Sequence, residues 1–475
     1  MHQIKLIFLL KTLNKEEFSR LGKFLNSPFY NYAIPPIHLY KSLKKFYPTF
    51  DSPKMTQELI WKKVYTNDAF NANKFWQLTS KLTQLVEQFL ISIELEKHPR
   101  EKQKFLIKAL APRNKKLLVK AIQEVDVELE EKKKTYAIYQ EDFLHQLSLS
   151  NFHGIFNTTE AIKYEERFLD RLELFYLFQK IKSAINLKSV EKHRNVSYSF
   201  YLIPEIIQLV ESDDFKQNPL LQFFSKLFQL VNDGSHDLYF EVKEIFIQLM
   251  DTFEGEDKKF VFHHLMNYVI FQVNSGDGEF RIEYLNLNKE GLKQNILLEN
   301  GKISYRTFTN IISQGASLQE FDWTEKFIKE YEKKLPESSK QDALTMGQGL
   351  LLFFKNDFSK TIDLLNNNQF EQTLERLRKN ELLLRSYFEL FLREPSYYNL
   401  LISFITSFDK YLHRDEIEAN KRIELTINFI KVIKRLSKLI YDKKFLENHR
   451  IKFINELKKE KMILKPWLLE KIKSI

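Results

Sequence analysis

A stretch of more than twenty residues keeps an unbroken helical period, and this feature constrains the fold of the chain most strongly. Apolar side chains follow Asn71 at intervals of three or four residues, at Phe75, Leu78, Leu82, Leu85, Phe89 and Ile93. This spacing places one apolar stripe along an α-helix. Shorter stretches with the same spacing follow through the rest of the chain, separated by polar turns. The pattern predicts an all-α protein.

Few residues interrupt these helical patterns. The 475 residues include 11 glycines and 12 prolines, so glycine is far rarer than its average usage of roughly 7%. This scarcity disfavours sheet-rich folds and glycine-lined phosphate sites. The chain has no cysteine, which excludes disulfides, thiolate metal sites and cysteine nucleophiles.

Three segments are expected along the chain. Residues 1–98 are predicted to form a basic N-terminal helical module that ends before Pro99. Residues 99–300 are predicted to form a central region of long helices, one of them running from Leu117 to about Leu149. Residues 301–475 are predicted to form tetratricopeptide-like hairpins followed by basic C-terminal helices. The first helices of the module are expected to begin after the N-caps Asn14, Thr56 and Asn71.

The net charge of +10 is unevenly distributed. Residues 1–120 carry 22 basic and 9 acidic side chains, which gives +13, and residues 421–475 carry 16 and 6, which gives +10. The residues between them carry 35 basic and 48 acidic side chains, which gives −13. Basic ends could face nucleic acid or another anionic surface. They could equally be solvated helix faces, because the lysines alternate with glutamates and no block of five like charges occurs.

The last third of the sequence contains an internal repeat. Trp323, Phe358 and Tyr397 align with spacings of 35 and 39 residues. Five residues before these anchors lie Leu318, Phe353 and Leu392, and four residues after them lie Phe327, Ile362 and Leu401. Polar turns separate the anchors, so each unit is expected to be a helix, a tight turn and an antiparallel helix. Such units must stack to bury their apolar faces, which predicts an α-solenoid.

The middle unit resembles a tetratricopeptide repeat. The residues that carry this likeness are Gly349, Leu352-Phe353, Asn356-Asp357-Phe358, Ile362 and Leu365. They stand where the motif has its small residue, its aromatic pair, its turn and its second-helix apolar positions. The small alanine of the motif is replaced by Thr361.

A broader likeness covers most of the chain. It is carried by Leu10-Lys11-Thr12-Leu13-Asn14-Lys15-Glu16-Glu17-Phe18, Phe24-Leu25-Asn26-Ser27-Pro28-Phe29, Phe175-Tyr176-Leu177-Phe178-Gln179-Lys180, Met266-Asn267-Tyr268, Phe308-Thr309-Asn310-Ile311 and Glu320-Phe321-Asp322-Trp323. These segments resemble an uncharacterised family of all-helical bacterial proteins with tetratricopeptide-like C-terminal halves. The resemblance implies a fold and no particular activity.

Motifs for catalysis or cofactor binding are not found in the sequence. Gly347-Gln348-Gly349 lacks the third glycine of a dinucleotide fingerprint and is interpreted as a pair of helix-packing glycines. His263 and His264 are adjacent, so a helix would point them about 100° apart, and we interpret them as core or surface residues rather than metal ligands. We therefore expect no catalytic residue, no cofactor and no metal site, and predict that the protein is not an enzyme.

Lysines interleaved with aromatic residues are the clearest remaining indication of function. They are Lys41, Lys44, Lys45, Lys62, Lys63, Lys74 and Lys81. A module of short basic helices could contact nucleic-acid phosphates. The neighbouring aromatic residues, however, fall at core spacing, and arginines, which recognise phosphate best, are few.

The leading functional expectation is a protein–protein interaction scaffold that uses a helical-repeat surface. Its acidic middle region would favour a basic segment of an unidentified protein or peptide. The alternative is an adaptor that binds nucleic acid or the ribosome through the basic N-terminal module. No transmembrane segment or signal peptide is indicated by the sequence, so a cytoplasmic location is expected.

Overall fold

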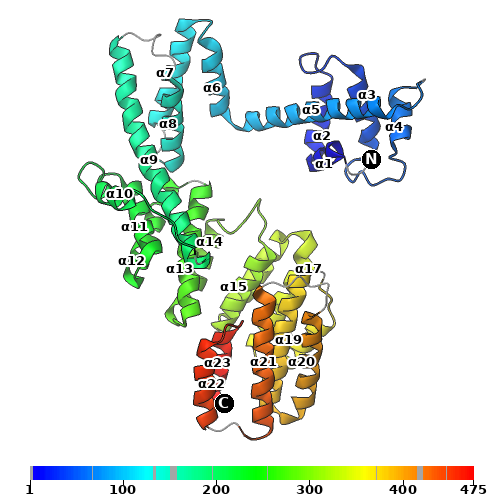
Figure 1. The fold of residues 1–475 in the computed structure, drawn as a ribbon, viewed down its shortest axis with the longest axis vertical. Helices are drawn as coiled ribbons and strands as arrows, with labels where there is room; N and C mark the ends of the chain where they lie inside the picture. Colours follow the sequence, from blue (N-terminus) through cyan, green and yellow to red (C-terminus); the bar gives the residue numbers. More distant parts are fainter. Residues whose placement is uncertain are drawn as a thin grey trace. The chain divides into compact units, whose positions relative to one another are not determined.

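The computed structural model describes residues 4–66, 68–131, 135–149, 158–194, 196–253, 255–370, 372–413, 421–444 and 447–475. The all-α prediction is confirmed, because the regular structure of these residues is helical and includes no β-strand (Figure 1). None of the described helices combines the length and the apolar character that crossing a bilayer requires.

The chain divides into two compact units. Unit 1 comprises Met1–Lys133 and Ile138–Glu173, and unit 2 comprises Lys134–Ala137 and Leu174–Ile475. The division between them falls within α9 (Thr158–Arg194). The break expected before Pro99 is the point at which one helix ends and the next begins.

Unit 1 opens with a module in which the long helix α5 packs against α1, α2 and α3. The helices of this module are α1 (Lys5–Thr12), α2 (Lys15–Leu25), α3 (Ile34–Leu43), the short 3-10 helix η1 (Lys44–Phe46), α4 (Gln57–Val64) and α5 (Ala72–Lys97). Leu21, Leu82 and Trp61 lie in a shared apolar core and are at most 1% exposed. The helical stripe that defines α5 is therefore buried against three other helices.

The three N-caps expected in this module are confirmed. The Asn14 side chain accepts a hydrogen bond from the Glu17 N–H at 2.9 Å, and the Glu17 carboxylate accepts one from the Asn14 N–H at 3.0 Å. This reciprocal pair is a capping box. Thr56 and Asn71 likewise accept hydrogen bonds from the backbone three residues further on. Each cap satisfies a backbone donor that the first helical turn leaves free.

The single helix expected from Leu117 to about Leu149 is wrong. The structure has two helices there, α7 (Lys115–Glu131) and α8 (Tyr136–Leu149), and α6 (Pro99–Leu110) precedes them. All three helices contribute to one apolar cluster, which contains both Leu118 and Leu149. One straight helix would separate those two residues by about 46 Å. Burying both in one cluster requires the chain to turn back.

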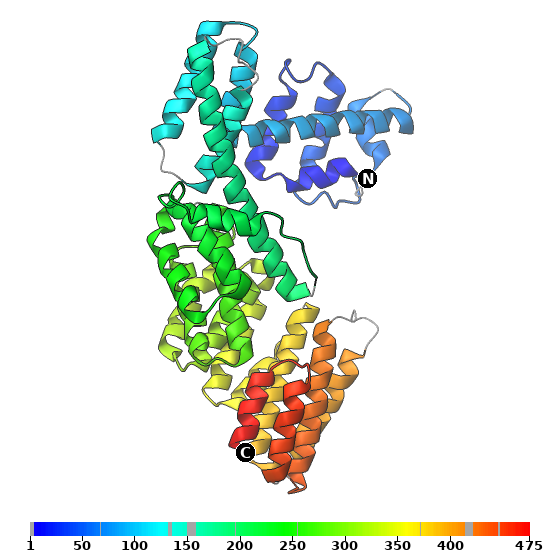
Figure 2. The same cartoon turned by 60° about the vertical axis from the view of Figure 1, so that its left-hand side comes forward.

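Unit 2 holds the rest of the helices. They are α9 from Leu174 onward, α10 (Ile203–Val210), α11 (Pro219–Asp233), α12 (His236–Gln248), η3 (Met250–Thr252), α13 (Gly255–Ser275), α14 (Glu279–Lys293), α15 (Tyr305–Ser317), α16 (Phe321–Tyr331), η4 (Glu332–Lys334), α17 (Glu337–Phe354), α18 (Phe358–Asn366), α19 (Thr373–Arg393), η5 (Pro395–Tyr397), α20 (Tyr398–Leu412), α21 (Lys421–Tyr441), α22 (Glu447–Lys459) and α23 (Lys465–Ser474). Helices that follow one another in the chain pack together, including α15 with α16, α17 with α18 and α19 with α20. Figure 2 shows α19, α20 and α21 side by side at the C-terminal end of this unit.

The turns after α15 and α17 share one backbone geometry. Gln319 and Asn356 have φ angles of 62° and 63°. The residue after each donates its N–H to the carbonyl five positions earlier, at 3.0 Å in both turns. This arrangement is a Schellman C-cap. It makes Phe321 and Phe358 the first residues of the following helices, whereas the sequence repeat aligns Phe358 with Trp323, two residues away.

We expect Gly315→Ala to destabilise unit 2, because α15 and α16 approach closely at this residue. A Cβ atom there would overlap the hydroxyl group of Thr324, which is fully buried. Overpacking of this kind costs about 1–3 kcal/mol of unfolding free energy. Urea denaturation would measure the loss. In the control Gly278→Ala, a Cβ has nothing within 4 Å, and equal losses in both variants would contradict the prediction.

Candidate functional site

A groove between α9 and α13 is the clearest candidate site in unit 2. The residues of α9 that line it recur every three or four positions and are polar: Gln179, Lys182, Ser183, Asn186, Ser189 and Lys192. The facing residues of α13 include six aromatic ones, Phe260, Phe262, His263, His264, Tyr268 and Phe271, beside Glu256, Asp257, Lys259, Met266, Asn267 and Gln272. The groove contains two hollows of about 690 Å³ and about 470 Å³. His264 lines both, so they form neighbouring parts of one groove.

An ion pair lies in the lining of the larger hollow. Lys182 Nζ lies 2.6 Å from Asp257 Oδ1, and the two side chains are only 15% and 12% exposed. The same ammonium lies 5.1 Å from the centre of the Phe260 ring. A buried pair loses its hydration and depends on the partner and the ring for compensation. This contact joins α9 to the N-terminal part of α13.

The smaller hollow is mainly apolar. Leu230, Val231 and Phe271 contribute to its wall, and the Phe271 side chain is 60% exposed. The Tyr268 hydroxyl donates a hydrogen bond to the Gly234 carbonyl at 3.3 Å, and burial raises the pKa of Tyr268. Tyr268 therefore stays neutral at physiological pH and serves as a fixed side of the hollow.

A buried network behind this wall holds α12 and α14 together. The Tyr239 ring stacks on Tyr268 with ring centres 5.2 Å apart. The Tyr239 hydroxyl donates to Glu283 at 2.6 Å, and Lys243 Nζ lies 2.7 Å from the same carboxylate oxygen. Burial, with the neighbouring Glu283 charge, raises the pKa of Tyr239. These contacts pack α12 and α14 behind the aromatic side of the groove.

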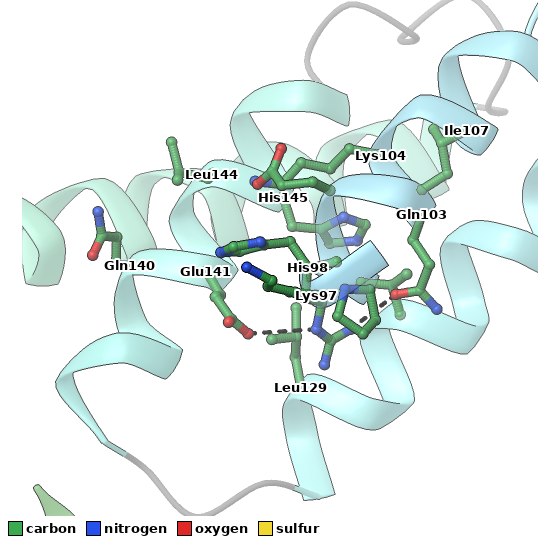
Figure 3. A pocket seen from close by; sticks show the side chains of 14 residues that line it. Lys97, His98, Gln103, Lys104, Ile107, Leu129, Gln140, Glu141, Leu144 and His145 are labelled. Carbon is green, nitrogen blue, oxygen red and sulfur yellow. Dashed lines mark hydrogen bonds and ion pairs between the residues drawn. The ribbon is translucent and has the colours of Figure 1, made fainter. Parts of the chain in front are cut away.

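A separate hollow of about 240 Å³ lies in unit 1, near the junction of α5 and α6 (Figure 3). Arg100 lies beside it, 2.7 Å from Glu128 and 3.4 Å from Glu141. His145 Nε2 lies 3.1 Å from Asp126 Oδ1. Each of these carboxylates has a basic neighbour on another helix. The arrangement therefore fits a structural role, in which paired charges fasten α6, α7 and α8 together.

The seven lysines singled out in the sequence are all exposed. Lys41 lies in the last turn of α3, Lys44 and Lys45 in η1, Lys62 and Lys63 in the last turn of α4, and Lys74 and Lys81 in the first half of α5. No ion pair joins any of them to a residue of the described ranges. Lys63 Nζ lies 5.8 Å from the centre of the Phe46 ring, which brings η1 and α4 together. Their charges are thus available to an external anion.

The nine repeat anchors contribute to the packing of unit 2. Phe327, Phe353, Phe358, Ile362 and Leu401 are buried, whereas Leu318, Trp323, Leu392 and Tyr397 are partly buried. Leu318 caps the C-terminal end of α15, and Tyr397 lies in η5. The helix-packing interpretation of Gly347 and Gly349 agrees with the structure, because a Cβ would lie 2.7 Å from Ile312 and 3.2 Å from Leu365, respectively.

Comparison with known proteins gives no match to a family model, to a curated protein or to a solved structure. The likeness to a helical bacterial family therefore stays a prediction. Among the residues that the structure describes, no group of three or more His, Asp and Glu side chains could hold a metal ion.

The groove itself is not predicted from the sequence. Its only local indication is the run of polar residues at helical spacing along α9, from Gln179 to Lys192. His264 is interpreted from the sequence as a core or surface residue, and the structure places it at 3% exposure between the two hollows. The facing helix lies some eighty residues further along the chain, so pattern alone could not show that the two helices enclose a groove.

Removing one partner of the Lys182–Asp257 pair should destabilise unit 2. Lys182→Ala leaves the Asp257 carboxylate buried without its ammonium, which costs about 3 kcal/mol of unfolding free energy. The double variant Lys182→Met/Asp257→Leu should regain most of that loss. Chemical denaturation would compare them, with Lys259→Ala, a member of an exposed pair, as the control. A double variant less stable than the single variant would contradict this account.

Proposed function

We propose that this protein is a non-enzymatic interaction scaffold that holds a segment of a partner polypeptide in the α9/α13 groove. The observation that carries the proposal is the chemistry of the groove's two sides. Amide, hydroxyl and ammonium groups on α9 suit a polypeptide backbone, and the aromatic side on α13 suits apolar side chains. From Gln179 to Lys192 the groove follows α9 for about 20 Å. That length accommodates a short helix or an extended peptide.

The charges around the groove are balanced. Lys182, Lys192 and Lys259 oppose Asp233, Glu256 and Asp257. The acidic middle of the sequence suggested a basic partner segment, but the groove's own lining has no dominant sign. Binding should therefore depend on an apolar anchor in the smaller hollow and on hydrogen bonds along α9. Such binding is only weakly sensitive to salt.

The proposed scaffold is a tetratricopeptide-like solenoid at its C-terminal side. Support comes from the packing of α15 on α16, of α17 on α18 and of α19 on α20, and from the apolar core whose buried residues range from Leu292 to Ile472. Stacked helix pairs share such a core because a single pair cannot bury its own apolar face. The interaction scaffold expected from the sequence is thus proposed here with its binding groove on α9 and α13.

Phe271 provides a direct test of the groove. We expect peptides selected from a displayed random library to carry an apolar anchor, and Phe271→Glu to weaken their binding at least tenfold, since it places a charge in the apolar hollow. Fluorescence anisotropy with labelled peptides would measure the affinity. Ile247→Glu is the matched control, because Ile247 is 44% exposed and lies on α12 outside the groove. Failure to enrich peptides, or equal effects of both variants, would overturn the proposal.

Nucleic-acid binding by the N-terminal module is a second candidate function. The observation that favours it is the exposure of seven lysines that lack ion pairs with described residues. The quadruple variant Lys44→Glu/Lys45→Glu/Lys62→Glu/Lys63→Glu should then lose binding to labelled single-stranded RNA at low salt. The dependence of binding on salt should also become weaker. The slope of log affinity against log salt concentration should fall by about 0.7 for each phosphate that the variant no longer binds.

A charge-matched variant controls for net charge. Lys431, Lys434, Lys438 and Lys443 are also exposed and lie in or just after α21. Their replacement by glutamate changes the total charge equally without touching the module. Equal loss of RNA binding in both variants, or binding by the wild type that does not weaken with salt, would contradict this second candidate.

A further inference from the structure

The chain from the end of α2 to the first residue of α3 exposes four large apolar side chains within six residues, and three of them are more than half exposed. Phe29 is 81% exposed, Tyr32 is 88% exposed, and Ile34, the first residue of α3, is 62% exposed. Pro28 beside them is exposed as well. Single apolar residues on a surface are ordinary, whereas a cluster of this kind marks a contact site. We call Phe29, Tyr32 and Ile34 the loop knobs.

The loop knobs are held outward by a fixed backbone. Asn31, only 7% exposed, donates hydrogen bonds from its side chain to the carbonyls of Leu25 at 3.0 Å and Ala33 at 2.8 Å. Its side-chain oxygen accepts a third from the Ala33 N–H at 3.0 Å. The Tyr30 ring stacks on Phe24 with ring centres 4.1 Å apart. The Tyr30 ring is 42% exposed and also meets the Phe29 ring, with ring centres 4.9 Å apart. Because the buried Asn31 side chain fixes the backbone here, Phe29 and Tyr32 project into solvent.

The sequence around the loop carries no negative charge. From residue 18 to residue 50 there are five lysines and arginines and no aspartate or glutamate. Lys23 is exposed in the last turn of α2. It lines a hollow of about 520 Å³ together with Tyr30, Arg20, Glu16 and Glu96, and the Arg20–Glu96 pair at 2.6 Å accounts for one carboxylate. In this hollow Arg20 and Lys23 balance the charges of Glu16 and Glu96. The loop's surroundings therefore carry no net negative charge that would repel an anionic surface.

We propose that the loop knobs dock this protein onto an anionic lipid surface. Each knob is well over half exposed, so the three project as separate points rather than as the walls of a groove. A lipid interface requires no matching pocket, only apolar side chains that reach the acyl boundary and basic residues that meet the headgroups. Aromatic rings are favoured at that depth. Ile34 offers no ring for base stacking, which favours lipid over single-stranded nucleic acid as the occupant.

Vesicle flotation of the full-length protein tests the proposal directly. We expect the wild type to float with vesicles of phosphatidylcholine and phosphatidylserine, and to bind severalfold less to phosphatidylcholine alone. The variant Phe29→Ser/Tyr32→Ser/Ile34→Ser should lose at least tenfold of its partitioning. All three positions are exposed, so circular dichroism should show an unchanged fold.

A matched control removes comparable apolar surface from the same module. Phe8, Trp76 and Ile91 are 57%, 71% and 67% exposed, and Phe8→Ser/Trp76→Ser/Ile91→Ser should float like the wild type. Equal losses in both triple variants would overturn the proposal, as would a wild type that does not float. The wild type could fail to float and instead self-associate or bind RNA in a way that the loop variant does not. That result would assign the loop to another occupant and would also overturn the proposal.

The absence of cysteine from the sequence allows a second measurement. A single Tyr32→Cys variant can be labelled at that position alone with an environment-sensitive fluorophore. Insertion should raise and blue-shift its emission when anionic vesicles are added, whereas the same label at Ile91→Cys should not respond. No response at position 32 in a protein that floats would overturn docking by the loop. The groove variant Phe271→Glu should keep full flotation, which separates this proposal from the scaffold function.

Discussion

The burial of α19 is the constraint on which the C-terminal part of unit 2 depends. Glu381, Arg385 and Glu389 are buried along with its apolar residues, and each needs compensation from another helix. The Arg385 guanidinium lies 4.2 Å from the centre of the Phe353 ring and 5.1 Å from that of Trp467, and burial lowers the pKa of Arg385 to about 10. The Arg422 guanidinium lies 2.6 Å from Glu381 Oε2. Lys471 Nζ lies 2.7 Å from Glu389 Oε1. Through these contacts α17, α21 and α23 all take their positions from one helix, because an uncompensated buried charge is strongly destabilising.

The α9/α13 groove arises differently. Here the polar face of α9 is not buried against the neighbouring helix, whereas those three charged residues of α19 are buried and compensated. The α9 residues from Gln179 to Lys192 that line the groove are polar, and they face an aromatic stripe on α13. Polar groups gain nothing from close packing against rings unless they are paired, and the Lys182–Asp257 ion pair is one contact that joins the two faces. Two hollows lie along this interface, and the hydrogen bond from Tyr239 to Glu283 lies behind its aromatic side. A groove of this origin is a property of the fold rather than an accident of loop conformation.

What the sequence could predict depended on how far apart the interacting residues are. The caps at Asn14, Thr56 and Asn71 were predicted correctly because each hydrogen bond spans three residues. The helix from Leu117 to about Leu149 was wrong, since a continuous period does not reveal that Leu118 and Leu149 must reach one cluster. The repeat register rested on aromatic residues, whereas the turns are set by the positive φ of Gln319 and Asn356. The groove joins helices that are distant in sequence, and the outward direction of Tyr32 depends on three hydrogen bonds of Asn31; neither leaves a periodic signal.

The two proposed contact surfaces differ in chemistry as well as in position. The groove in unit 2 is concave and has balanced charges, so it selects an occupant by shape and by hydrogen bonds. The loop knobs in unit 1 project outward and lie in a basic stretch of sequence free of carboxylates. They would therefore favour a surface that is negatively charged and has an apolar layer beneath its charged groups. Because salt screens the second kind of contact far more than the first, raising the ionic strength should release the protein from an anionic surface while a peptide stays bound in the groove. A chain with both surfaces could therefore bring a bound peptide to an anionic surface. At higher salt it would dissociate from that surface while the peptide stays bound in the groove.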